Sequence, residues 1–506
     1  MRAPIWAALL LLTGCTAIGD ATGVLMPVVP VGQGSVRQFS LLQGPEAELF
    51  FPATKRLVLL LSASGSAPPA VAFRVQDSTL LNESPAVDHL GGDAAFTADL
   101  RRWHAQIRPA RKVQANLAIG TQLDFWINTG DSKSTGDCLR HAVIVYQSAH
   151  AHYLADTGPV SGEGPCGGPA GIAPAPEQLR TLAAAFEGGF GDDTAALVPG
   201  ANSIYQTVTG LFGPDPVGGG IDGDPRTFVV ISPAVDHFGK EKGLLGYFWS
   251  RDVQPRNGTP DDPRSHSNEH EAIFLTDQIF RQRPYTTFGT LAHEFTHLVI
   301  YYQRSALGAL GEDAWWDEAL AMLAMDRVGY GLRAGNEDIA KDIHYFLVNP
   351  VAYSLTQWNR NPNGFAYGLV YLYARFIYDR YGPELFREII AIPDGAIAAI
   401  DRALRRRGTT FEALFSDFMV AMYASGANLI VEPRFRFGTD LSLQASYGRI
   451  QLRGIQAPGL TRPGMIEGIT LRPWSTAFFE LSQASVQPWN ISVRVPVPFF
   501  GSALTY

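Results

Sequence analysis

The chain has 506 residues, of which 46% are hydrophobic and 17% are charged, and its formal net charge is −8. This length holds enough apolar material for two or three hydrophobic cores. The negative charge and the lack of a Lys/Arg cluster exclude nucleic acid from the expected partners. The one short basic run, Arg405–Arg407, is expected at the solvated end of a helix, where cations suit the helix dipole.

The N-terminus has the features of an export signal. Arg2 precedes an apolar run from Ile5 to Leu12 that is too short to span a bilayer, and the run ends in "LTGC" at Cys15. This segment resembles a bacterial lipoprotein signal peptide, which is cut before a cysteine that carries the lipid; the alternative is an ordinary secretory signal with a chance cysteine. We expect a protein anchored at Cys15, at the outer membrane because Thr16 and not Asp follows.

Export also accounts for the other cysteines. With Cys15 assigned to the lipid, Cys138 and Cys166 remain, and such a pair in an oxidising compartment usually forms a disulfide. No His or further Cys stands at C-x-x-C spacing near either residue, so we interpret both as structural and not as metal ligands. No later stretch reaches about 18 uninterrupted apolar residues, so the mature protein is expected to be anchored to a membrane without spanning it.

The sequence pattern changes along the chain. Short apolar runs such as "RLVLLLSA" and "HAVIVYQ", broken by turn residues, predict a β-rich first part, and the last part returns to this pattern. Between them, helical spacing dominates, together with the short strands "RTFVVIS" and "EAIFLT". The predicted organisation is a signal peptide (1–14), a tether (15–34), an N-terminal β-rich domain (35–155), a Gly/Pro-rich connection (156–176), a mixed domain (177–425) and a C-terminal β-rich domain (426–506).

Two motifs place histidines four residues apart. "HSNEH" (266–270) has the H-x-x-E-H order of the inverzincins, and "HEFTH" (293–297) has the order H-E-x-x-H. Residues i and i+4 share one face of an α-helix, so two imidazoles at this spacing reach one zinc ion only if the segment is helical. The first motif follows Pro260 and Pro263 without helical periodicity, and we predict that His266 and His270 are polar loop residues outside the metal site.

The second motif passes the helicity test. Apolar residues from Leu291 to Tyr302 repeat at helical spacing, which leaves His293 and His297 together on another face with Glu294 beside them. The alternative is a core helix with two hydrogen-bonded histidines and a solvated glutamate. The continuation that metzincins need is absent, because Gln303 stands where the third histidine would be.

A catalytic zinc ion uses three protein ligands and leaves one position for water. Glu318, in "WWDEALAMLAMD", lies within an apolar helical run, where an unpaired carboxylate would be unfavourable. Glu312 and Asp313 lie in a polar segment instead and are interpreted as cap or solvent residues. Glu318 is therefore the predicted third ligand.

HEFTH followed by "WWDEALA" resembles the gluzincin zinc peptidases, and the surrounding residues, roughly 180–390, resemble the hyicolysin family of secreted bacterial metallopeptidases. The resemblance implies an α+β fold: a thermolysin-like gluzincin core of a small mixed sheet and a helical lobe, with an N-terminal β-sandwich-like domain and a small C-terminal β domain. It implies one zinc ion held by His293, His297 and Glu318, with Glu294 as general base.

Further roles follow from the same resemblance. Tyr367 is on a helix after the third ligand, where several gluzincins place a phenol that donates to the oxyanion, although it is also one of many tyrosines there. The strand "AIFL" (272–275) is the predicted edge for an extended peptide. Met322 stands where thermolysin-type enzymes have an Asp that orients a histidine, so Asp317 and Asp326 are the candidates for that role.

The sequence thus predicts a monomeric, lipid-anchored zinc endopeptidase that acts on proteins or peptides. The alternative is a surface-binding or adhesin-like lipoprotein whose peptidase core is inactive; the intact His293, Glu294, His297 and Glu318 argue against decay. Calcium at the "GIDGD" aspartates, Asp222 and Asp224, is weakly indicated, because a turn stabilised by Asp and Gly is the favoured interpretation.

Overall fold

A computed structural model describes most of the chain. It covers 23–31, 34–41, 46–63, 70–75, 117–127, 137–160, 174–188, 202–216, 220–236, 245–258, 262–308, 314–358, 366–429, 432–460, 465–494 and 499–505. The predicted signal peptide, the lipidation site Cys15 and the cysteine Cys166 lie outside these residues. Cys138 is disulfide-bonded, and its pairing with Cys166 stays a prediction. The chain divides into two compact units, and the fold as a whole is of the mixed α+β class.

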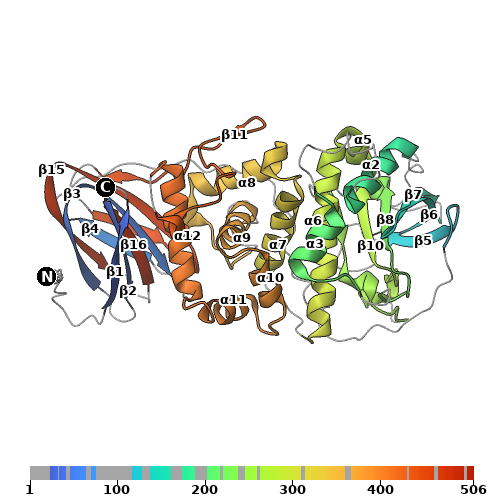
Figure 1. Cartoon of the computed structure of the whole chain (residues 1–506), viewed down its shortest axis with the longest axis horizontal. Coiled ribbons are helices and arrows are strands. Elements are labelled where there is room, and N and C mark those ends of the chain that lie inside the picture. Colours follow the sequence, from blue (N-terminus) through green and yellow to red (C-terminus); the bar gives the residue numbers. More distant parts are fainter. Residues whose placement is uncertain are drawn as a thin grey trace, which may run out of the picture. The chain divides into compact units, whose positions relative to one another are not determined.

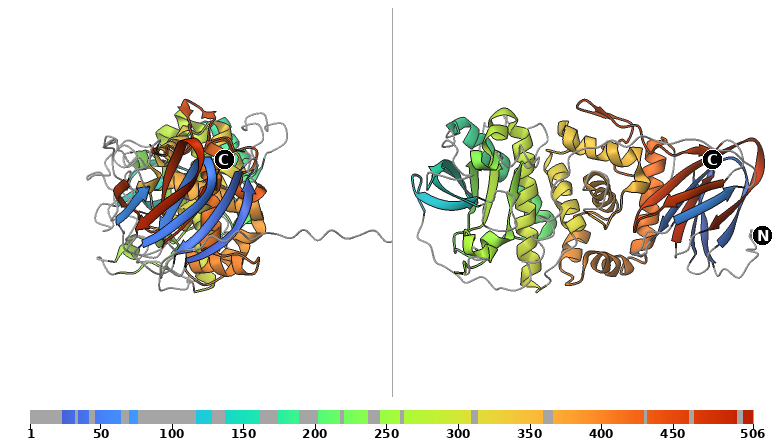
Figure 2. Two further views of the ribbon diagram at one scale, coloured as in Figure 1. Left: turned by 90° about the vertical axis from the view of Figure 1, so that its left-hand side faces the viewer. Right: turned by 180° about the vertical axis from the view of Figure 1, so that it is seen from behind.

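The first unit joins strands from both ends of the chain in one sheet (Figures 1 and 2). The strand order is β1-β2-β16-β3-β15-β4-β14, and β13 pairs with β15. The strands are β1 (Gly23–Val31), β2 (Gly34–Leu41), β3 (Glu46–Ala63), β4 (Ala70–Val75), β13 (Gly459–Leu460), β14 (Met465–Thr470), β15 (Thr476–Arg494) and β16 (Phe499–Thr505). The long strands β3 and β15 run antiparallel, with Ser62 opposite Thr476 and Glu46 opposite Arg494.

This pairing corrects the predicted domain boundaries. The N-terminal and C-terminal β-rich regions were expected to form separate domains, but the first unit consists of Met1–Pro85, Ile430–Glu432 and Ala457–Tyr506. Leu57–Leu61 of β3 are buried, as are Phe478 and Phe479 of the neighbouring strand. The two ends of the chain therefore contribute neighbouring strands to one sheet, which the local strand pattern does not reveal.

The second unit contains a six-stranded mixed sheet in the order β5-β6-β7-β8-β10-β9. Its strands are β5 (Gln122–Ile127), β6 (Cys138–Gln147), β7 (Ala151–Pro159), β8 (Thr227–Ser232), β9 (Gly246–Phe248) and β10 (Ala272–Thr276). Strands β7, β8 and β10 are parallel, and β9 is antiparallel to β10 at the edge. Strands β5–β7, which were assigned to the N-terminal domain, belong to this sheet because β7 pairs with β8.

Helices follow and flank this sheet, as predicted from 177 onward. They are α2 (Pro176–Glu187), α3 (Ile204–Phe212), α5 (Asp277–Gln282), α6 (Pro284–Ala306), α7 (Ala314–Val328), α8 (Glu337–Val348), α9 (Tyr367–Tyr381), α10 (Pro383–Ile390), α11 (Ala396–Arg405) and α12 (Phe411–Gly426). In Figure 1, α6 lies between the sheet and α7. Of the helices that the structure describes, none is both long and apolar enough to cross a membrane.

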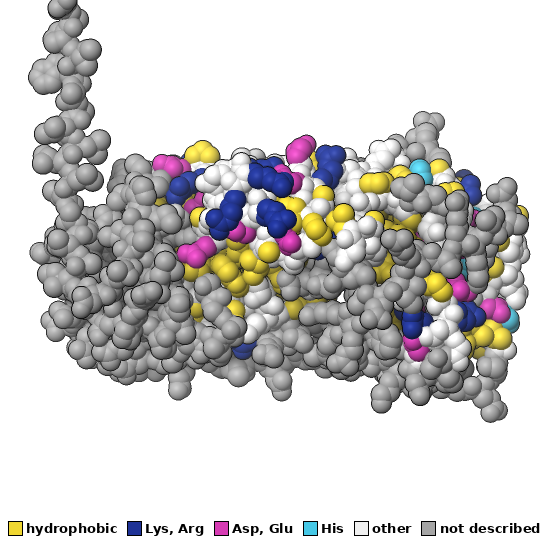
Figure 3. All heavy atoms as spheres, turned by 90° about the horizontal axis from the view of Figure 1, so that it is seen from below, with side chains coloured by type: hydrophobic (Ala, Val, Ile, Leu, Met, Phe, Trp, Pro, Cys, Tyr) yellow, Lys and Arg dark blue, Asp and Glu magenta, His cyan; other side chains and the backbone are white. Residues whose placement is uncertain are grey.

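The basic run Arg405–Arg407 stands at the C-terminal end of α11, as predicted. Arg405 pairs with Asp401 at 2.6 Å, and the two following arginines pair with the carboxylate of Glu388. Figure 3 views the molecule from the side on which α11 lies in Figure 1, and it shows Lys and Arg side chains gathered with Asp and Glu between them. The run is therefore part of a solvated surface of mixed charge.

Candidate metal centre

Helix α6 presents two histidines on one face. It begins at Pro284, a residue whose fixed φ suits the first helical position, and its apolar positions, among them Leu291, Phe295 and Leu298, are buried. His293 and His297 therefore project together from a partly exposed face, with their ring centroids 4.7 Å apart. The helicity that the H-E-x-x-H motif needs is confirmed.

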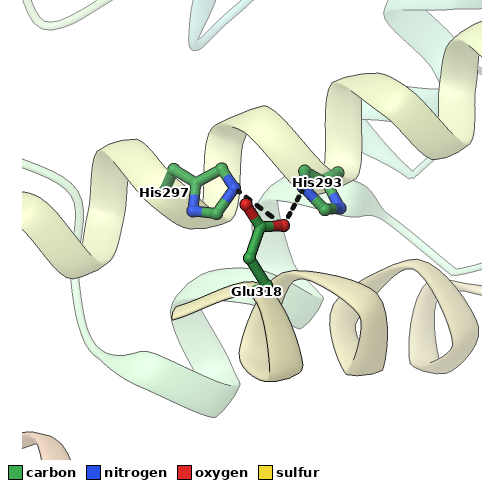
Figure 4. Close-up of side chains that lie close together, drawn as sticks. All are labelled: His293, His297 and Glu318. Atoms are coloured by element: carbon green, nitrogen blue, oxygen red, sulfur yellow. Dashed lines mark ion pairs between the residues drawn. The ribbon is translucent and has the colours of Figure 1, made fainter. Parts of the chain in front are cut away.

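Helix α7 brings the third predicted ligand to the same place. Its first turn is anchored by Trp315 and Trp316, each 1% exposed, and the second of these rings stacks on Phe386 at 5.9 Å. Glu318 comes two residues after Trp316 in the same helix, and its side chain points toward α6 (Figure 4). Its Oε2 lies 3.1 Å from His293 Nε2 and 3.9 Å from His297 Nε2.

The donor atoms of this group suit a divalent cation. One ligand atom from each of His293, His297 and Glu318 lies within 4.8 Å of the other two, and they form the one such group within the described parts of the chain. Two imidazole nitrogens and one carboxylate oxygen form the ligand set of gluzincin-type zinc sites. Oε2 of Glu318 is buried and accepts no hydrogen bond from any described residue, so it is available to a cation.

Asp317 contacts the histidine that it was a candidate to orient. Its Oδ2 lies 3.2 Å from His297 Nδ1, on the ring side away from Glu318. Burial lowers the pKa of His297, but the negative charges of Asp317 and then Glu318 outweigh burial and raise this pKa to about 10. The surroundings of His297 therefore favour a positive charge. The other candidate, Asp326, instead forms ion pairs with Arg375 and Arg327 at 2.8 and 2.7 Å. Of the two candidates, Asp317 is therefore the one that contacts a histidine of the group, His297.

Glu294 lies beside the group as a buried carboxylate. It is 8% exposed and accepts a hydrogen bond of 2.9 Å from the backbone N–H of Phe248 on β9. Burial raises the pKa of Glu294 above its ordinary value, the two histidines oppose this, and Glu318 adds to it. A carboxylate of raised basicity next to two candidate ligands has the properties of a general base.

Tyr367 opens helix α9 and reaches the same place. Burial, followed by the charges of Glu318, Asp342 and Glu294, raises the pKa of its phenol well above the ordinary range, and a hydrogen bond to Glu318 contributes. The ring is held edge-on against Trp358, with centroids 4.8 Å apart. The hydroxyl is therefore protonated at neutral pH and stands beside the candidate ligands as a hydrogen-bond donor.

The first histidine pair diverges. His266 ends a short 3-10 helix (η4, Pro263–His266), stacks on Trp126 at 3.7 Å and lies 3.1 Å from Asp137. His270 points elsewhere, with Nδ1 2.5 Å from Asp222 Oδ2. The two side chains share no ligand position, in agreement with the prediction, but His270 is 7% exposed and is therefore a buried residue and not a solvated loop residue.

The "GIDGD" aspartates form a turn. The backbone N–H of Asp224 donates to Asp222 Oδ1 at 2.7 Å, which is the predicted Asp-stabilised turn. The second carboxylate of the turn also contacts a histidine, because Asp224 Oδ2 lies 2.9 Å from His152 Nε2. Each aspartate is thus engaged with a histidine inside the fold.

The sheet edge next to the candidate site differs from the prediction. The strand "AIFL" was expected at the edge, but β10 pairs with β8 on one side and with β9 on the other. The edge strand is β9, and its Phe248 contacts Glu294. Sequence reasoning missed β9 because it spans only Gly246–Phe248, and three residues carry no strand periodicity.

A second buried carboxylate, Glu271, directly precedes strand β10. Glu271 accepts hydrogen bonds on Oε1 from Tyr302 and from the backbone N–H of Ile221. Burial and then the neighbouring charge of Asp222 raise the pKa of Glu271 to about 8. Because this folded-state pKa exceeds the ordinary 4.5, the proton on Glu271 stabilises the fold fully below about pH 4.5, and this contribution is lost as the pH rises through about 8.

Glu271→Gln is therefore expected to flatten the pH dependence of stability. The amide Oε1 can keep both hydrogen bonds, while the charge that forms at alkaline pH is removed. From about pH 5 to about pH 8.5 the wild type should lose a few kcal/mol of unfolding free energy that the variant keeps, since each unit of pKa difference corresponds to about 1.4 kcal/mol. Urea unfolding of both proteins at the two pH values measures this difference. An equal change of unfolding free energy with pH in the two proteins would contradict the prediction.

No protein-family model matches the chain, and no curated protein matches its sequence.

Proposed function

We propose that the chain is a zinc-dependent endopeptidase of the gluzincin type, similar to the hyicolysin-like metallopeptidases, with a thermolysin-like catalytic core formed by the six-stranded sheet and the helices around α6 and α7. The observation that carries this proposal is the convergence of His293 Nε2, His297 Nε2 and Glu318 Oε2 with the carboxylate of Glu294 beside them. The buried Oε2 of Glu318 accepts no hydrogen bond from any described residue, which supports a cation as its partner.

Each residue has a task in peptide hydrolysis. When bound, a zinc ion supplies Lewis acidity and lowers the pKa of a water molecule toward 7. Glu294 takes the proton of the attacking water and passes it to the leaving amine, and the Phe248 N–H holds this carboxylate in place. Tyr367 donates its hydroxyl hydrogen to the oxygen on which negative charge develops. Asp317 fixes the ring orientation of His297.

The edge strand supports an extended substrate. β9 ends at Phe248, so the backbone groups on its outer side lie next to Glu294, where a peptide can add as a further antiparallel strand. A peptide bound in this way would have a peptide bond near the general base.

We further propose that the protein acts as a monomer. We also propose that it is anchored through a lipid on Cys15, at the outer membrane, because the N-terminal segment resembles a lipoprotein signal peptide.

Metal content and hydrolysis test the proposal together. The purified chain is expected to bind one zinc ion and to cleave an unfolded protein substrate, and a chelator should abolish cleavage until zinc is restored. Elemental analysis and gel electrophoresis of the products measure the two properties. A chain that takes up no zinc and cleaves nothing under any tested condition would contradict the proposal and leave the alternative of an inactive core on a surface-binding protein.

A further inference from the structure

Asp342 of α8 lies next to the proposed oxyanion donor. Gly368, the residue after Tyr367, is in such close contact with α8 that an added Cβ would come within 2.3 Å of the carbonyl oxygen of Asp342. α8 and α9 therefore pack in close contact at this point (Figure 1). The charge of Asp342 is the second-largest electrostatic influence on the Tyr367 phenol, after that of Glu318. Asp342 thus lies on the part of α8 that packs against the start of α9, and its charge acts on the Tyr367 phenol.

The carboxylate of Asp342 has no cationic or hydrogen-bonding partner among the residues that the structure describes. Two charges act on it: Lys341, its chain neighbour, lowers its pKa without forming an ion pair, and Asp338, one helical turn earlier, raises it. Asp342 is partly exposed at the surface. The protein around its carboxylate nevertheless removes enough water to raise the pKa of this group to about 7. Carboxylates in such surroundings are normally paired, and no described residue pairs with this one.

The surroundings of Asp342 suit an aliphatic stem that ends in a cation. Tyr353 and Tyr367 both lie within the field of its charge, and Trp358 packs edge-on against the second of these rings. Aromatic rings cover the methylene groups of Lys and Arg, and a carboxylate forms charge-assisted hydrogen bonds with their ammonium or guanidinium heads.

We propose that Asp342 is a specificity residue that binds a Lys or Arg side chain of the peptide substrate close to the bond that is cleaved. This inference rests on the proposed peptidase function and names the substrate class of the same site. The substrate would supply the positive charge that none of the described residues pairs with Asp342. A free N-terminal amine has the same charge, and the experiment separates the two sources.

The test compares cleavage of peptides that differ at one position, and each peptide is made once with an acetylated and once with a free N-terminus. Each position flanking the scissile bond carries in turn Lys, Arg, norleucine, Gln or Glu, and kcat/KM is measured for the zinc-loaded chain. At one position the wild type should prefer Lys or Arg over norleucine by about 10- to 100-fold, the range expected for a hydrogen bond between charged groups. Asp342→Asn should lose this preference while still cleaving the norleucine peptide, and Asp342→Glu should keep part of it.

Asp338→Asn is the matched control, because it removes an exposed carboxylate one turn earlier on the same helix and should leave the preference unchanged. Equal loss of activity on all peptides in Asp342→Asn, or an unchanged preference, would overturn the inference. Dependence on Asp342 confined to peptides with a free N-terminal amine would overturn the side-chain assignment. Hydrolysis by the wild type without any cationic preference contradicts this inference alone, whereas no hydrolysis of any peptide contradicts the proposed function as well.

Discussion

Replacing Glu294 by Gln is expected to lower kcat/KM for peptide hydrolysis by about 10²- to 10⁴-fold, the usual contribution of a positioned general base, and to leave zinc binding intact. The amide oxygen can still accept the 2.9 Å hydrogen bond from Phe248, so the side chain keeps its place. The amide has no basic oxygen, however, and cannot take the proton of the attacking water. Parallel measurements of kcat/KM and of zinc per chain separate these two effects.

Glu271→Gln is the matched control for this variant. It also removes a buried carboxylate in the same unit, but Glu271 pairs with Tyr302 and Ile221 and contacts none of the proposed ligands. Its activity at neutral pH should stay close to that of the wild type. If the Glu294 variant retained activity within about tenfold of the wild type, the role of general base would have to move to another group.

The candidate site could be predicted because its information is local. HEFTH needs only a helix, and the apolar repeat from Leu291 to Tyr302 specifies one. Glu318 stood out as a carboxylate in an apolar helical run, and the tryptophans before it hold that turn in the core. The structure brings both segments together in the predicted way.

The pairing of the strands, and the partners of the carboxylates of Asp317, Asp326 and Asp222, could not be predicted in this way. β3 and β15 are separated by most of the chain, and alternating apolar residues indicate a strand without naming its neighbour. The choice between Asp317 and Asp326 depends on Arg375 of α9, which forms an ion pair with Asp326. The polar residues next to His270 in the sequence indicated a solvated side chain. Instead it is buried in contact with Asp222, 48 residues earlier.

The two histidine pairs are expected to differ in their effect on metal binding. His293→Ala removes one of three protein ligands and should reduce the zinc content from about one ion per chain toward zero. His266 and His270 contact Asp137 and Asp222, so their loss should not change the zinc content. Because His270 is buried against a carboxylate, His270→Gln, which keeps an N–H donor, is a better choice than His270→Ala, which would leave Asp222 unpaired at a cost of about 3 kcal/mol or more.

The decisive comparison is therefore between His293→Ala and the double variant His266→Ala with His270→Gln, measured by elemental analysis after dialysis against zinc-free buffer. Thermal unfolding of both proteins controls for loss of the fold, since a misfolded chain would lose zinc for an unrelated reason. Zinc retained in the first variant and lost from a folded second variant would place the metal at the H-x-x-E-H segment. That outcome would require His266 and His270 to leave their separate carboxylate partners and converge, which their positions in the 3-10 helix η4 and beside β10 oppose.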